Sequence, residues 1–174
     1  NIELFKFRTK NEEQGTMHTS QCLIILGMHR SGTSVLSGCL HLLGAELGKN
    51  LMPANSYNSW GFFENHDLVL IHDILFRELG CRWDMLGSLP DNWMNTSAAE
   101  QAREKIIRLW ERDFQGSDFC VIKDPRMCRL LPLWEEIFQE KGIDPRFVLM
   151  LRHPYEVACS LQNRENFDLL RGHL

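Results

Sequence analysis

The sequence predicts an α/β fold in which a parallel sheet is flanked by helices. Three runs of apolar residues, at 22–26, 119–122 and 147–151, lack the alternation of a strand with one wet face. We therefore expect strands that are covered on both faces. Segments with apolar residues at helical spacing lie between these runs. Strands that alternate with helices are typical of a parallel sheet, because parallel neighbours need a long crossover connection.

The helices are predicted from the spacing of their apolar residues. The segment 67–79, for example, places Leu68, Ile71 and Leu75 on one face. The last helix is opened by Pro154, a residue that is favoured at a helix start. The five predicted helices span residues 33–43, 67–79, 98–114, 130–140 and 154–170.

The remaining segments define the limits of the predicted domain. Residues 1–20 are mostly polar and form a lead-in, with a short edge strand expected near residues 2–7. Residues 50–63 are rich in Asn, Ser, Pro and Gly and predict a loop. Residues 21–174 are expected to form one α/β domain. Because Leu174 ends the sequence without a helix stop signal, we expect this domain to be an N-terminal portion that is C-terminally incomplete.

The composition excludes several classes of protein. With 174 residues, 44% of them hydrophobic, the chain can bury one core. A net charge of −4 argues against a nucleic-acid partner, which would need a basic face. No apolar stretch approaches the roughly 20 residues of a membrane helix. Six cysteines without Cys-x-x-Cys spacing, together with an N-terminus that lacks a secretory pattern, favour free thiols and a cytoplasmic protein.

The turn after the first predicted strand is the strongest functional signal. Residues 27–34, Gly-Met-His-Arg-Ser-Gly-Thr-Ser, lie between that strand and the helix at 33–43. In such a turn, backbone N–H groups and the helix N-terminus converge on one point and form an anion site. The spacing matches a P-loop, but Thr33 stands where a triphosphate site has lysine. Arg30 supplies a cation instead and can bind phosphate or sulfate with two N–H groups.

Cations also follow the other two predicted strands. Lys123 begins a Lys-Asp-Pro segment, and Arg152 begins an Arg-His-Pro segment. The carboxyl ends of parallel strands line one ligand crevice. We therefore expect Arg30, Lys123 and Arg152 to meet at one site.

These segments resemble the cofactor segments of sulfotransferases that use 3′-phosphoadenosine 5′-phosphosulfate (PAPS). The first turn fits that family's 5′-phosphosulfate loop without a gap. Arg152, followed eight residues later by Ser160, resembles the 3′-phosphate segment, and Arg164 lies one helical turn further on. The resemblance spans about residues 22–164 and implies a P-loop nucleotide-binding-like sulfotransferase fold. The cofactor-binding residues that it implies are Arg30, Ser31, Gly32, Thr33, Ser34, Arg152, Ser160 and Arg164.

The Lys-Asp-Pro segment resembles the one that follows a central strand in the protein-tyrosine branch of this family. In that branch the lysine lies beside the bridging oxygen of the phosphosulfate. The resemblance implies that Lys123 is catalytic, because negative charge builds on this oxygen as the S–O bond opens.

The catalytic base is left open between several residues. An acceptor hydroxyl must lose its proton as it attacks sulfur, so a carboxylate or imidazole is needed close by. Some sulfotransferases use a glutamate after the P-loop helix, and we predict Glu64, whose apolar surroundings would raise its pKa. Glu64 also fits the first turn of the next helix, where carboxylates are favoured for stability alone. The competing candidates are His66, Asp67, His72, Asp73 and Asp124.

The sequence therefore predicts a metal-independent sulfotransferase with PAPS as the donor and a hydroxyl or amine of a small molecule or glycan as the acceptor. A P-loop kinase or nucleotide hydrolase is the alternative enzyme; it would lack the lysine after Gly32 but would have Asp124 as a Mg²⁺ ligand. A non-catalytic nucleotide-binding module is the third possibility. Neither the acceptor nor the oligomeric state is indicated by any motif.

Overall fold

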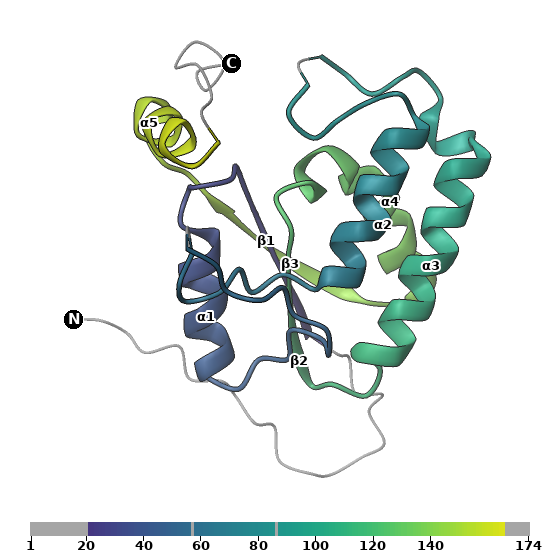
Figure 1. The fold of residues 1–174 in the computed structure, drawn as a ribbon. Helices are drawn as coiled ribbons and strands as arrows, with labels where there is room; N and C mark the ends of the chain where they lie inside the picture. The colour runs from purple at the N-terminus through teal and green to yellow at the C-terminus, as the bar shows by residue number, and fades with distance from the viewer. Residues whose placement is uncertain (1–20, 57, 86, 166–174) are drawn as a thin grey trace, which may run out of the picture.

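The chain forms a three-stranded parallel sheet flanked by helices, which confirms the predicted α/β class (Figure 1). This computed structural model describes residues 21–56, 58–85 and 87–165. The strands are β1 (Gln21–Gly27), β2 (Phe119–Lys123) and β3 (Asp144–Met150), and their order in the sheet is β2-β1-β3. The predicted lead-in, the edge strand near residues 2–7 and the helical residues 166–170 lie outside the described residues.

In the part of the chain that the structure describes, five α-helices connect or follow the strands, each close to its predicted place. On one side of the sheet lies α1, and on the other side lie α2, α3 and α4 (Figure 1). A short 3₁₀ helix, η1 (Trp93–Asn95), precedes α3. The α-helices are α1 (Thr33–Leu42), α2 (His66–Glu78), α3 (Ser97–Asp113), α4 (Met127–Lys141) and α5 (Pro154–Glu165).

Strands β1 and β2 separate two apolar clusters. Side chains alternate between the faces of a strand, so Ile24 and Ile122 belong to the larger cluster, with α2, α3 and α4. Ile25 and Val121 belong to the smaller cluster, against which Leu36 of α1 packs. The prediction that these strands are covered on both faces is confirmed for β1 and β2.

The same prediction is wrong for β3. The side chains of Phe147 and Leu149 are 44% and 59% exposed, so the described part of the chain leaves their face of β3 uncovered. The strand also begins three residues earlier than predicted and includes Pro145, because it pairs with β1 along its whole length. Among the described strands β3 lies at an edge of the sheet, where a missing proline N–H is tolerated.

The start of α4 also differs from the prediction. This helix begins at Met127 rather than Leu130, directly after the Lys-Asp-Pro segment. The Met127 N–H donates to the carbonyl oxygen of Asp124 (3.0 Å), and the Cys128 N–H donates to that of Pro125 (3.3 Å). The chain therefore enters α4 a few residues after β2 ends. The residues that follow Lys123 stay close to the carboxyl edge of the sheet.

Two expectations from composition can be compared with the structure. Within the described residues, no helix is long and apolar enough to cross a membrane. The six cysteines are free thiols, although only Cys22 and Cys120 are buried.

Candidate functional site

A cavity of about 250 Å³ opens at the carboxyl ends of β1 and β2. Because all three strands are parallel, the segments that leave Gly27, Lys123 and Met150 depart from the same edge of the sheet. Most of the predicted site residues line the cavity, namely Arg30, Gly32, Thr33, Ser34, Glu64, Lys123 and Arg152.

The turn between β1 and α1 is held in a compact shape. Gly27 has φ 143°, and a Cβ there would lie 2.6 Å from the carbonyl oxygen of Met150, so only glycine fits. The Ser31 hydroxyl and the Ser31 N–H both donate to the carbonyl oxygen of Met28, at 2.6 and 3.2 Å. Ser31 thus stabilises the turn and does not line the cavity.

The N-terminus of α1 faces the cavity through Gly32, Thr33 and Ser34. Gly32 is the N-cap residue, with φ 95°, and no side chain caps the helix. The first backbone N–H groups of a helix have no partner within the helix, and its dipole favours an anion at this end. With Arg30 and Arg152 in the same wall, this part of the cavity suits a phosphate or sulfate group.

Arg30 lies next to Arg152 and Ser160, which come from a distant part of the chain. The Arg30 Nε donates to the Ser160 Oγ at 2.7 Å. The Arg152 Nη1 donates to the Arg30 carbonyl oxygen at 3.0 Å, and its Nε donates to Glu156 at 2.8 Å. Arg30 therefore links Arg152 to Ser160, the two residues that the resemblance assigns to one phosphate. Arg164 belongs to α5, and its side chain lies outside the described part.

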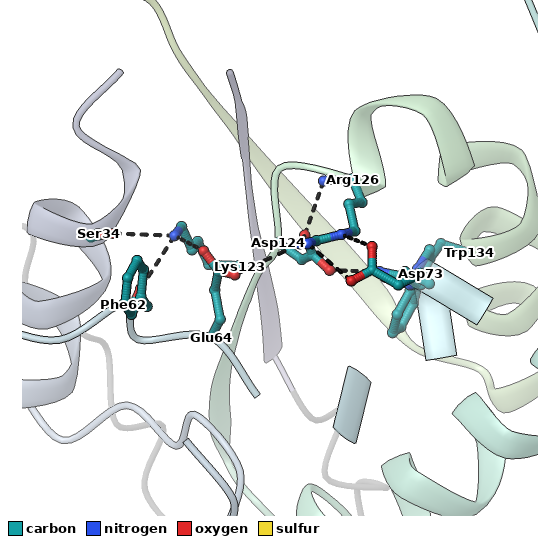
Figure 2. A network of polar contacts seen from close by, with 9 residues as sticks. Ser34, Phe62, Glu64, Asp73, Lys123, Asp124, Arg126 and Trp134 are labelled. Atoms are coloured by element: carbon teal, nitrogen blue, oxygen red, sulfur yellow. Dashed lines mark hydrogen bonds and ion pairs between the residues drawn. The ribbon is translucent and has the colours of Figure 1, made fainter. Parts of the chain in front are cut away.

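Lys123 also lines the cavity, next to the first turn of α1. Its ammonium donates to the Ser34 Oγ (3.1 Å) and to the Phe62 carbonyl oxygen (3.2 Å), and it forms an ion pair with Glu64 (Figure 2). An ammonium has three protons to donate, and each has an acceptor here. Lys123 is only 4% exposed, so its charge is held in one place beside the N-terminus of α1.

Glu64 lies in an extended segment immediately before α2. The Asn65 side chain caps that helix by accepting from the Leu68 N–H (3.2 Å), so Glu64 is outside the first turn, where a merely helix-stabilising carboxylate would lie. Glu64 is 4% exposed yet lines the cavity. Burial raises the pKa of Glu64, and the negative charge of Asp124 adds to this rise. The positive charge of Lys123 acts in the other direction but does not cancel the rise.

Asp124, which directly follows β2, forms a buried hydrogen-bonded pair with His72 of α2. The His72 Nδ1 lies 2.7 Å from the Asp124 Oδ2, while the Trp134 indole N–H donates to the His72 Nε2 at 3.1 Å. An indole N–H can only donate, so the Nε2 is an acceptor and His72 is the neutral tautomer with its proton on Nδ1. Burial alone would raise the pKa of Asp124, but the hydrogen bond from His72 and the charge of Arg126 outweigh burial and lower it.

The other candidate bases lie away from the cavity wall. His66 is the first residue of α2, where its N–H donates to the Asn50 carbonyl oxygen at 2.7 Å. Asp67 pairs with Arg112 at 2.7 Å. Asp73 pairs with Arg126. Of the carboxylates and imidazoles that we considered as bases, only Glu64 lines the cavity.

Sequence analysis missed Arg126. This guanidinium is 11% exposed and lies between Asp73, Asp124 and Glu64, behind the cavity wall (Figure 2). The feature that could have identified Arg126 is its position directly after Lys-Asp-Pro. Residues that follow a parallel strand lie at the carboxyl edge of the sheet, close to the ligand crevice. The cavity also includes His29, which contacts the ring of Trp83 at a centroid distance of 4.3 Å.

No protein-family model, curated protein or solved structure matches this chain.

Proposed function

We propose that this chain carries the donor site of a sulfotransferase with the P-loop sulfotransferase fold, which transfers a sulfuryl group from PAPS to a hydroxyl or amine. The observation that carries the proposal is one cavity lined by an uncapped helix N-terminus and two arginines and also by the Lys123–Glu64 pair. The first group suits the anionic donor, and the second suits proton removal and charge stabilisation in the transition state.

The proposed reaction is an in-line displacement. The acceptor oxygen attacks the sulfur atom, the bond between sulfur and the bridging oxygen breaks, and adenosine 3′,5′-bisphosphate leaves. Lys123 is proposed to stabilise the charge that appears on the bridging oxygen. Glu64 takes the proton from the hydroxyl or amine of the acceptor substrate. A carboxylate with a raised pKa is better suited to this role than one with an ordinary pKa.

The kinase alternative is less well supported, because it needs an acidic ligand for Mg²⁺. Both oxygens of Asp124 accept hydrogen bonds within the protein, from Arg126 (3.0 Å) and from His72 (2.7 Å). Asp124 is also fully buried, so it cannot reach an ion in the cavity without breaking these bonds.

The 3′-phosphate is proposed to bind between Arg152 and Ser160. We expect Arg152→Ala to weaken the binding of adenosine 3′,5′-bisphosphate at least tenfold and to leave ADP binding nearly unchanged, because a charged hydrogen bond contributes about 1.5–3 kcal/mol. Ser160→Ala is expected to act in the same direction, since the Ser160 hydroxyl accepts from Arg30 and keeps its own proton to donate. Isothermal titration calorimetry with both nucleotides measures the effect.

Arg146→Ala is the matched control for this experiment. Arg146 lies on β3 and pairs with Asp144 at 2.7 Å, much as Arg152 pairs with Glu156 at 2.8 Å, but it is outside the cavity. The control should leave both affinities unchanged. Equal losses for the two nucleotides in Arg152→Ala would refute the assignment of Arg152 to the 3′-phosphate.

A further inference from the structure

Arg126 divides its contacts unequally among three carboxylates. Its Nε and Nη2 donate to the two oxygens of Asp73 at 2.6 and 3.2 Å, and its Nη1 donates to Asp124 at 3.0 Å. The distance from Nη1 to the nearest Glu64 oxygen is 3.9 Å, beyond a hydrogen bond. The guanidinium therefore neutralises Asp73 and Asp124 more than it neutralises Glu64 (Figure 2).

The charges of this cluster do not balance. Glu64, Asp73 and Asp124 contribute three negative charges, whereas Lys123 and Arg126 contribute two positive charges. The neighbouring His72 directs its two ring nitrogens at other groups, Asp124 and Trp134. A proton on Glu64 would remove the excess negative charge, and the low dielectric of the interior makes that gain larger than it would be in water.

The other charged or titratable groups that face Glu64 across the cavity are Arg30, Arg152 and His29. The two arginines lie on the side proposed to hold the anionic cofactor, which would offset their positive charge when it is bound. The cluster behind Glu64 therefore remains as the permanent influence on its protonation.

We propose that Asp73 and Arg126 are positioning residues that keep Glu64 able to accept a proton, an inference that rests on the proposed role of Glu64 as the base. Asp73 binds the guanidinium in a two-pronged contact and turns it away from Glu64. Without the negative charge of Asp73, the positive charge of Arg126 is left to act on Glu64, stabilises the ionised carboxylate and makes it a weaker base.

The test is Asp73→Asn, with the ionisation of Glu64 followed by carboxyl ¹³C NMR of glutamate-labelled protein and the Glu64 signal assigned with Glu64→Gln. The Asp73 side chain is 44% exposed, and asparagine can still accept from Arg126, so the fold should be retained. We expect the pKa of Glu64 to fall by about one unit, which is typical of the loss of a nearby like charge. Asp73→Glu should restore it.

Asp67→Asn is the matched control. Asp67 lies on the same helix, α2, and pairs with Arg112 at 2.7 Å, with its side chain 32% exposed. Asp67→Asn should leave the pKa of Glu64 unchanged, because Arg112, the partner of Asp67, does not contact Glu64. A Glu64 pKa that is unchanged or raised in Asp73→Asn would overturn the inference.

A second readout separates this inference from the proposed function. In the active protein, the acidic limb of the pH profile of kcat should move to lower pH in Asp73→Asn, together with the NMR titration. If the NMR titration moves but PAPS supports no transfer, the electrostatic role of Asp73 holds and the sulfotransferase proposal fails. If transfer occurs but the NMR titration of Glu64 does not move, the sulfotransferase proposal holds and the electrostatic role of Asp73 fails.

Discussion

Replacing Lys123 with methionine is expected to lower the free energy of unfolding by about 3–5 kcal/mol, because it leaves the buried carboxylate of Glu64 without its main counter-charge. Removing that carboxylate as well should restore much of the loss, so Lys123→Met/Glu64→Gln is expected to be more stable than Lys123→Met alone. Urea unfolding of both single variants and the double variant measures the coupling between the two residues.

Lys141→Met provides the comparison. Lys141 forms an ion pair with Glu111 at 2.7 Å on the surface of α4, with its side chain 25% exposed. Such a pair contributes at most about 1 kcal/mol, so this variant should be nearly as stable as the wild type. If the losses in Lys123→Met and Glu64→Gln simply add, the buried pair described above does not exist in solution.

Glu64→Gln is expected to lower kcat by about 10²–10⁴-fold, the usual contribution of a general base, with little change in the affinity for adenosine 3′,5′-bisphosphate. Glutamine keeps the size of the side chain and can still accept from Lys123. The measurement is steady-state transfer of radiolabelled sulfate from PAPS to an acceptor panel by the active protein, alongside nucleotide binding.

The pH dependence of this reaction has a defined sign. A base must be ionised to act, so kcat should rise with pH as Glu64 loses its proton. Because burial raises the pKa of Glu64, the rise should be centred above the ordinary glutamate value of 4.5. His66→Ala should leave kcat nearly unchanged, since His66 does not line the cavity. A near-normal kcat in Glu64→Gln with none in His66→Ala would assign the base to His66.

The sequence was sufficient to predict the fold class and the residues that meet at the carboxyl edge of the sheet. Uninterrupted apolar runs predicted the positions of β1 and β2. Because parallel strands end at one edge of a sheet, Arg30, Lys123 and Arg152 were expected to lie close together, and all three line the cavity. The exposure of β3 was not predictable in this way, because an apolar run has the same pattern in an edge strand as in a central one.

The choice among the candidate bases needed three-dimensional contacts. Glu64 and Asp124 are both buried carboxylates near Lys123, yet their pKa values shift in opposite directions. The difference arises from partners far away in the sequence: His72 donates to Asp124 from α2, 52 residues away. Arg126 was missed for the same reason, since its importance depends on Asp73, which lies 53 residues earlier.

We propose that the cavity recognises a 3′-phosphorylated adenine nucleotide without a metal ion. Calorimetric titration of the wild-type protein with adenosine 3′,5′-bisphosphate and with ADP, both in EDTA, tests it most directly. We expect the 3′,5′-bisphosphate to bind at least tenfold more tightly, since only this nucleotide offers a 3′-phosphate to Arg152 and Ser160. Equal affinities, or binding of ADP that appears only when Mg²⁺ is restored, would contradict it.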